Sequence, residues 1–240
     1  MQSNLIQKTY ESQKNKIEKM KLCKEPYKVE VFNKEIIVNP NVFYPATDTK
    51  LLISSIKPSS EDKCLECFAG TGCIAIFLAQ NAKEVVATDI NQDAVKNIQE
   101  NIKLHKLENK MKAVNADVFP QTKEKFDIIA INPPYSDFEA KDVIEKSLFD
   151  KDHESLHKFF KEAKNYLNSN GKIYSTWSNF ADFDFFIKLV KEYNYSIKQI
   201  NEISKDMKIY KVFEIKSNKD LSGFGIANNF KRDKRTREIE

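Results

Sequence analysis

The stretch KCLECFAGTGCIAIFLA, at residues 63–79, constrains the fold of this 240-residue chain more than any other. It predicts a short buried strand over 64–68, a tight glycine turn over 69–72 and the first turns of a helix over 73–79. Gly70 and Gly72 accept backbone angles that a Cβ atom disfavours, and they let a ligand approach the free N–H groups of the new helix. In an open α/β sheet, such a turn at the carboxyl end of a strand binds a nucleotide-like ligand.

Acidic residues around this turn strengthen the prediction. Glu66 lies at the end of the strand, and Asp89 ends the run VVATD about twenty residues after the turn, where a carboxylate that binds ribose hydroxyls is expected. The spacing Gly70-x-Gly72-x-x-Ala75 also fits the loose dinucleotide-binding fingerprint. From these residues alone, an NAD-dependent oxidoreductase is therefore an alternative of another class.

Two further motifs follow in order, Asn115-Ala-Asp117 and Asn132-Pro-Pro-Tyr135. The ordered set resembles the class I S-adenosylmethionine-dependent methyltransferases, and NPPY is the signature of the branch that methylates planar amide or amine nitrogens. The resemblance covers residues 41–201 and implies an α/β fold, a doubly wound, mostly parallel seven-stranded sheet of the Rossmann-like kind. Strands that alternate with helices along the chain favour the same doubly wound sheet.

The resemblance implies that S-adenosylmethionine (SAM) is the cofactor. Segment 43–49 is similar to the cofactor-covering motif of release-factor glutamine methyltransferases, so its last residue would approach the methionine end. Phe68 stands where many members have a glycine, although FAGTG is similar to the loop of some rRNA-methylating members. The resemblance implies that Glu66 lies near the methionine and ribose end of the cofactor, Asp89 at the ribose hydroxyls and Asp117 near the adenine amino group. Val118 would lie beside the adenine ring. The residues expected to bind the cofactor are Thr49, Glu66, Phe68, Gly70, Gly72, Asp89, Ile90, Asp117, Val118 and Asn132.

The chemistry of the NPPY motif follows from its residue types. The nitrogen of an amide or an aniline-like NH₂ is a poor nucleophile because its lone pair is delocalised, and two acceptors can orient its hydrogens. Asn132 supplies a side-chain carbonyl, and Pro133 supplies a backbone carbonyl with no N–H of its own. Tyr135 offers a flat face on which a planar group can stack. We expect these three residues to be catalytic.

The methyl acceptor stays open at this stage. Segment 43–49 and NPPY favour a glutamine of a protein such as a release factor, whereas the FAGTG loop and the net charge of +4 favour an RNA nucleobase. A small-molecule metabolite is a further alternative. The sequence does not predict an oligomeric state.

The rest of the chain predicts the elements around this site. Residues 1–40 form an N-terminal helix and β-hairpin extension with its turn at Asn33-Lys34, residues 41–216 form the SAM-binding domain, and residues 217–240 form a polar tail. A helix begins near Thr47 or Asp48, which are good caps, and Asn91 caps another. Helices also cover 156–167, ended by Gly171, and 183–193. Further strands are expected over 85–88, 111–115, 126–131, 172–177, 195–200 and 208–215.

Several classes of protein are disfavoured. No apolar run approaches the ~20 residues of a membrane span, and the N-terminus lacks the apolar core of a signal peptide, which predicts a cytoplasmic protein without a membrane partner. Cys64-x-x-Cys67 with Cys73 has poor geometry for zinc, so these cysteines are expected to be buried apolar residues. His153 and His157 lack a third ligand at convincing spacing, and no metal site is expected.

Overall fold

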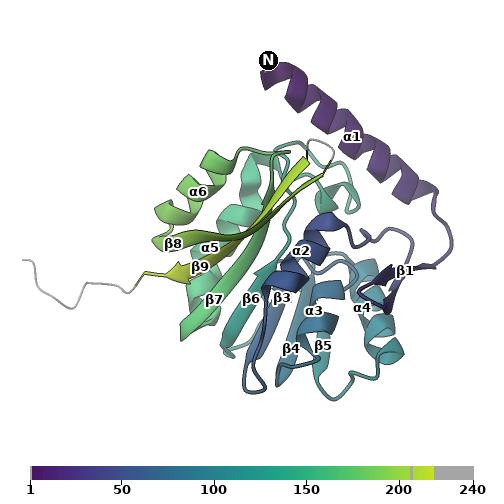
Figure 1. Ribbon diagram of the computed structural model, residues 1–240. Helices are drawn as coiled ribbons and strands as arrows, with labels where there is room; N and C mark the ends of the chain where they lie inside the picture. The colour runs from purple at the N-terminus through teal and green to yellow at the C-terminus, as the bar shows by residue number, and fades with distance from the viewer. Residues whose placement is uncertain (1, 206–207, 219–240) are drawn as a thin grey trace, which may run out of the picture.

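The computed structural model describes residues 2–205 and 208–218, with side chains described from residue 10 onward. Its centre is a seven-stranded sheet in which all strands are parallel except one, β9, which runs antiparallel to both of its neighbours (Figure 1). This arrangement confirms the predicted mostly parallel, seven-stranded α/β fold. Across the sheet, the order is β5 (Met111–Asn115), β4 (Glu84–Asp89), β3 (Lys63–Cys67), β6 (Phe126–Ile131), β7 (Leu167–Ser178), β9 (Lys208–Ser217) and β8 (Tyr195–Lys205).

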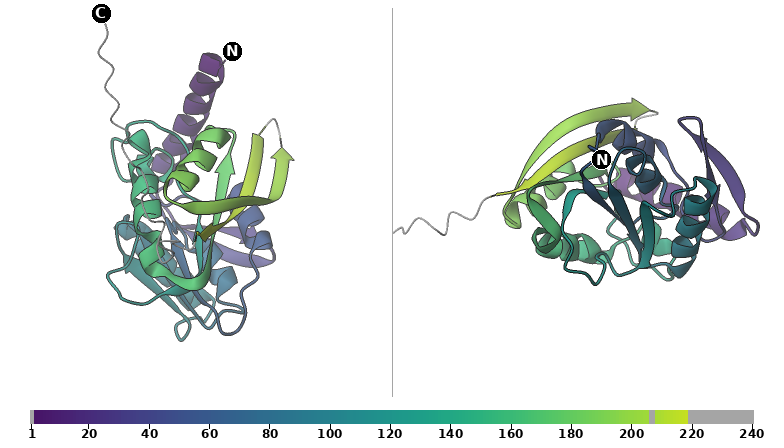
Figure 2. Two further views of the ribbon diagram at one scale, coloured as in Figure 1. Left: turned by 90° about the vertical axis from the view of Figure 1, so that its left-hand side faces the viewer. Right: turned by 90° about the horizontal axis from the view of Figure 1, so that it is seen from below.

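Helices cover both faces of the sheet, and alternate residues of each strand face one layer or the other (Figure 2). In β3, Cys64 belongs to the core cluster with α2 (Thr47–Ser55), α3 (Cys73–Leu78) and α4 (Gln92–Leu104). The next residue, Leu65, belongs to the opposite cluster, with α5 (Glu154–Tyr166) and α6 (Phe183–Glu192). Burial on both faces explains why strands such as FDIIAI are almost continuously apolar.

The chain changes direction across the sheet between β3 and β6. From β3 it continues to β4 and β5 on one side, and it then returns to place β6 on the other side of β3. The carboxyl ends of β3 and β6 are therefore neighbours at a topological switch point, where open α/β sheets bind ligands. The glycine turn follows β3 and the NPPY motif follows β6, so the fold brings the two motifs together.

The N-terminal segment packs on the outside of this core. Helix α1 (Gln2–Leu22) projects from the body, and its Ile17 packs in a small cluster with Leu148 and Phe149 (Figure 1). Strands β1 (Tyr27–Val31) and β2 (Lys34–Val38) form the expected hairpin, but its turn lies at Phe32-Asn33, one residue before the predicted position, because these two residues take left-handed φ values of 45° and 61°. Two buried asparagines of α4, Asn97 and Asn101, bind the backbone of the hairpin through both donors and acceptors at 2.8–2.9 Å.

Two further local predictions were wrong. Helix α2 begins at Thr47, but the cap is Ala46, whose N–H donates to the Thr49 hydroxyl at 3.2 Å, so neither Thr47 nor Asp48 caps the helix. Gly171 does not end a helix. Helix α5 ends at Tyr166, and β7 already begins at the next residue. Asn91 does cap α4, because its side chain accepts the N–H of Asp93 at 3.0 Å. The predicted tail lies outside the described residues beyond position 218.

Gly171 has a packing role inside β7, and its replacement is expected to destabilise the fold. A Cβ at this position would contact the side chain of Leu167 and lie 2.9 Å from the backbone oxygen of Phe126. Overpacking against backbone costs about 1–3 kcal/mol, so Gly171→Ala should lower the free energy of unfolding by that amount. Chemical denaturation measures it, with the exposed Asn170→Ala as control; equal stabilities of the two variants would contradict this packing.

Candidate active site

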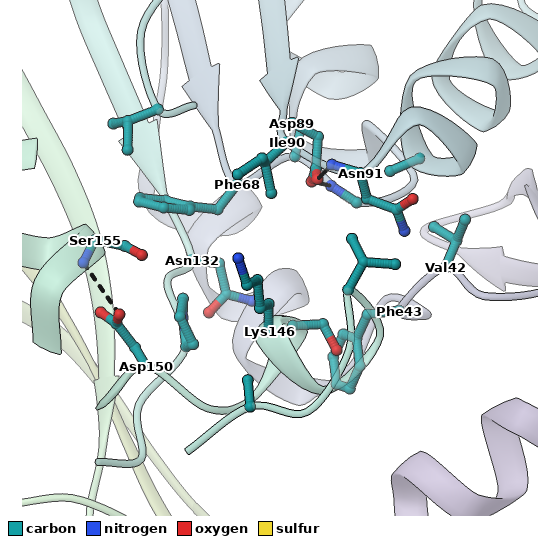
Figure 3. A pocket seen from close by; sticks show the side chains of 18 of the residues that line it. Val42, Phe43, Phe68, Asp89, Ile90, Asn91, Asn132, Lys146, Asp150 and Ser155 are labelled. Carbon is teal, nitrogen blue, oxygen red and sulfur yellow. Dashed lines mark hydrogen bonds between the residues drawn. The ribbon is translucent and has the colours of Figure 1, made fainter. Parts of the chain in front are cut away.

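A cavity of about 410 Å³ opens at the carboxyl ends of β3, β4, β5 and β6 (Figure 3). Every residue predicted to bind the cofactor lines it except Gly72. The close-up shows Phe68, Asp89, Ile90 and Asn132 around the same space (Figure 3). Gly72 instead faces α4, because a Cβ there would lie 3.0 Å from the side chain of Ile98. Its backbone φ of 72° is left-handed, so this glycine serves the turn rather than the cavity lining.

The carboxylates of Asp89 and Glu66 hold the glycine turn and the start of the helix that follows it. Asp89 accepts the N–H of Gly70 at 2.8 Å with one oxygen and the N–H of Asn91 at 2.8 Å with the other. Glu66 is 2 % exposed and accepts the N–H of Ala75, in the first turn of α3, at 2.7 Å. The turn is therefore held in its ligand-binding shape before any ligand arrives.

Burial changes the acidity of both carboxyl groups. Burial raises the pKa of Glu66 to about 8, although the hydrogen bond that it accepts from the N–H of Ala75 acts in the opposite direction. The charge of Asp89 adds to the upward shift. Burial also raises the pKa of Asp89, although N–H groups of Asn91 and Gly70 oppose the shift. A buried acid with a raised pKa is destabilising when it is ionised and no cation compensates it.

Because of Glu66, the ligand-free protein is expected to lose stability as pH rises. Between the ordinary value of 4.5 and about 8, the folded state binds more protons than the unfolded state, so the free energy of unfolding falls across this window. Glu66→Gln keeps an acceptor for Ala75 and removes this slope. The melting temperature of the parent should drop by roughly 7–15 °C more than that of Glu66→Gln between pH 5 and pH 8.5. The exposed Glu61→Gln is the control, and parallel profiles of parent and Glu66→Gln would contradict the shift.

The residues expected near the adenine lie together at another part of the cavity wall. Asp117 forms an ion pair of 2.6 Å with Lys158 of α5. Val118 is buried with a left-handed φ of 73°, and its carbonyl accepts the hydroxyl of Thr88 at 2.6 Å. Ile90 is 46 % exposed although it is apolar. An apolar side chain left open at a cavity mouth fits a site that an aromatic ring covers.

The NPPY motif divides between two cavities. Asn132 lines the large cavity and also a second cavity of about 40 Å³, whose lining includes Pro133 and Tyr135. Tyr135 is 5 % exposed, its ring packs edge-on against Trp177 at 5.4 Å, and it does not line the large cavity. The structure therefore does not support the expected stacking platform at Tyr135. Its hydroxyl lies 2.6 Å from the side-chain amide of Asn132, so Tyr135 is a direct neighbour of that group.

One wall of the large cavity was not predicted from the sequence. This wall follows NPPY and includes η1 (Glu145–Ser147), η2 (Lys151–His153) and the start of α5, and its Lys146 points into the same space as Asn132 (Figure 3). A run of charged residues after NPPY was the signal for it. Its cavity-lining residues are Glu139, Ala140, Val143, Lys146, Ser147, Phe149, Asp150, Lys151, Glu154, Ser155 and Lys158.

The cysteines and histidines considered as metal ligands are either buried in the core or in contact with aromatic side chains. Cys64, Cys67 and Cys73 are free and buried, and burial raises the pKa of each thiol. His157 lies 2.9 Å from the hydroxyl of Tyr193, and His153 stacks on Phe185 with ring centroids 4.5 Å apart. Across residues 2–205 and 208–218, no group of three potential ligands could hold a metal ion, and no helix is long and apolar enough to cross a membrane.

The donor set of the cavity fits SAM. Acidic side chains can accept from ribose hydroxyls and amines, and Phe68, Ile90 and Val118 provide apolar surface between them. The turn at Gly70 leaves room for a ligand, since a Cβ there would contact only the backbone oxygen of Phe43, at 3.5 Å. A mostly parallel seven-stranded sheet, with this cavity at its switch point and the NPPY motif at the end of β6, agrees with the architecture that the resemblance to class I SAM-dependent methyltransferases implies.

The comparisons with known proteins agree with this class. Residues 33–213 match the family model "Methyltransferase small domain", and the chain belongs to that family. A putative protein N5-glutamine methyltransferase of Methanocaldococcus jannaschii is 35 % identical over 152 residues, which are 60 % of this chain and 76 % of that protein. The release factor glutamine methyltransferase of Borreliella burgdorferi is 31 % identical over 161 residues, but the match covers 61 % of this chain and only 56 % of that protein.

A solved structure shares the fold at lower identity. The 16S rRNA N2 G1207 methyltransferase of T. thermophilus, in complex with AdoMet and guanosine, has a TM-score of 0.62 and 20 % identity, over 81 % of this chain and 50 % of that one. Family membership decides against the NAD-dependent alternative and confirms that the chain is a methyltransferase.

Proposed function

We propose that this chain methylates the side-chain amide nitrogen of a glutamine in a protein substrate. Relatives at 31–35 % identity carry this activity in their names, one of them on a release factor. A release factor is therefore the first acceptor to test. Since protein synthesis is cytoplasmic, the proposal implies a cytoplasmic enzyme.

The observation that carries the proposal is the meeting of two cavities at Asn132. The large cavity has the residues for the cofactor, and the small one, of about 40 Å³, extends on the side of Pro133. One water-sized probe needs roughly 10–15 Å³ of such volume, so the small cavity admits a group of about three heavy atoms. A carboxamide has this size, whereas a purine base is several times larger. Tyr135, buried beside Trp177, also offers no open face to a base.

The roles of the residues follow from their chemistry. The bound cofactor supplies an electrophilic methyl group. The side-chain oxygen of Asn132 accepts one N–H of the acceptor amide, and the backbone oxygen of Pro133 accepts the other. Two fixed acceptors hold the NH₂ group in one orientation toward the methyl group, and orientation of this kind lowers the activation barrier.

A labelling experiment tests the acceptor class. We expect the purified chain, incubated with SAM labelled in its methyl group, to label a release factor, with the added methyl located on a glutamine by peptide mass spectrometry. Transfer RNA, ribosomal RNA and a metabolite extract are assayed in parallel with Asn132→Ala as the blank. Label on RNA or on a metabolite, with none on protein, would overturn the proposal.

A further inference from the structure

Four polar side chains meet behind the large cavity: Asn132, Asp48, Tyr135 and Thr176. Of these, only Asn132 is predicted to bind the cofactor. The hydroxyl of Tyr135 lies 2.9 Å from Asp48 Oδ2, 2.6 Å from Asn132 Oδ1 and 2.9 Å from Thr176 Oγ1. Thr176 Oγ1 lies in turn 2.6 Å from Asn132 Oδ1. Asp48, Tyr135 and Thr176 are at most 6 % exposed. Each contact joins two side-chain atoms directly, so its proton must come from one of these four side chains.

A count of protons decides which way the amide of Asn132 faces. With its oxygen toward the cluster, the four contacts share only the hydroxyl protons of Tyr135 and Thr176. Two contacts would then bring lone pairs together at 2.6–2.9 Å, which is costly in a buried site. The oxygen and the NH₂ group of an amide have nearly the same shape, so the hydrogen-bond network determines their placement.

The opposite orientation satisfies the whole cluster. The NH₂ of Asn132 then donates to the oxygens of Tyr135 and Thr176, Thr176 donates to Tyr135, and Tyr135 donates to Asp48. Each of the four contacts receives one proton. Burial raises the pKa of Tyr135 well above its usual value, which keeps the hydroxyl a donor. Asp48 can serve as the final acceptor through Oδ2. Its other oxygen, Oδ1, accepts the N–H of Thr49 at 2.8 Å, which holds the carboxylate in place.

We propose that Asp48, Tyr135 and Thr176 are positioning residues that hold the Asn132 amide with its oxygen toward the cofactor cavity. In this orientation the amide oxygen of Asn132 lies 3.5 Å from Oγ1 of Thr49, and the Thr49 hydroxyl can donate to it. Both Thr49 and Asn132 line the large cavity. The remaining lone pair of the amide oxygen is available to an acceptor N–H. This inference rests on the proposed function only for its effect on methyl transfer.

Asp48 is the residue on which the orientation depends. It is the only member of the cluster that accepts without donating, so it fixes the direction of every other bond. In Asp48→Asn, the new amide can donate to Tyr135, Tyr135 then donates to Asn132, and the amide of Asn132 is free to turn. Its NH₂ would face the NH₂ of the acceptor, a contact between two donors.

The test uses Asp48→Asn beside Asp184→Asn. Both aspartates are the second residue of a helix, but Asp184 is exposed on α6, away from the cavity lining. We expect Asp48→Asn to lower kcat roughly 10- to 100-fold, as a small misorientation of a reacting group does, with the Kd of S-adenosylhomocysteine unchanged within about twofold. Asp184→Asn should match the parent. Thr176→Val should also lose activity, and Thr176→Ser, which keeps the hydroxyl, should recover most of it.

A second measurement reports the orientation without any methyl acceptor. In ¹⁵N-labelled protein, the side-chain NH₂ of Asn132 is identified by its absence from the spectrum of Asn132→Ala. We expect its protons to exchange slowly with water in the parent and faster in Asp48→Asn. Fast exchange in the parent, or parent-like kcat in Asp48→Asn, would overturn the positioning role. A failure of the proposed glutamine activity would leave the exchange result as it stands, so the two failures are distinguishable.

Discussion

Replacing Asn132 with alanine is expected to slow methyl transfer roughly 10²–10³-fold, as the loss of one preorganised polar group at a reacting centre does. The substitution removes the acceptor at the junction of the two cavities. The carboxylates of Glu66 and Asp89, which hold the glycine turn, are untouched. The effect should therefore appear in kcat, and the Kd of S-adenosylhomocysteine should stay within about threefold of the parent value.

Single-turnover transfer and calorimetry measure the two quantities for Asn132→Ala. The exposed Asn170→Ala serves as the matched control and should behave as the parent does. Parent-like transfer by Asn132→Ala would show that the acceptor is oriented by other groups. Loss of S-adenosylhomocysteine binding as large as the loss of transfer would show that Asn132 acts through the cofactor alone.

Replacing Asp89 with alanine is expected to weaken cofactor binding roughly 10- to 100-fold. Its two oxygens accept the N–H groups of Gly70 and Asn91, at 2.8 Å each, so the variant loses the charged acceptor that shapes the turn. A hydrogen bond to a charged group contributes about 1.5–3 kcal/mol, and this energy converts to the stated range of Kd. Calorimetry with S-adenosylhomocysteine measures the change.

Asp89→Asn provides the graded comparison for this prediction. The asparagine keeps one acceptor oxygen and gives up the charge, so its Kd should lie between those of the parent and Asp89→Ala. The transfer rate at saturating cofactor should recover in both variants, because the acceptor side of the site is unchanged. Parent-like binding by Asp89→Ala would show that cofactor binding does not depend on the carboxylate at the end of β4.

The sheet was predictable because each strand has a local signal. Runs such as FDIIAI are apolar on both faces, and only burial between two helical layers explains that pattern. The glycine turn and NPPY end neighbouring strands, so the parallel topology alone brings them to one edge. The order of the motifs was therefore enough to predict that these residues line one cavity.

The errors lie where distant contacts decide the outcome. Tyr135 has the residue type of a stacking platform, but a partner from α2, Asp48, and one from β7, Thr176, bind its hydroxyl in the interior. Gly171 has the residue type of a helix stop, but its close approach to Phe126 of a neighbouring strand requires a residue without a Cβ. Neither contact leaves a periodic or local pattern in the sequence.

The most direct measurement of the central claim is a crystal structure with S-adenosylhomocysteine bound. We expect the ligand to fill the 410 Å³ cavity across the glycine turn, with its ribose hydroxyls at Asp89 and its sulfur directed toward Asn132. The small cavity beside Pro133 should stay open to the acceptor. A ligand bound elsewhere on the chain, or in this cavity with its sulfur directed away from Asn132, would contradict the assignment of the site.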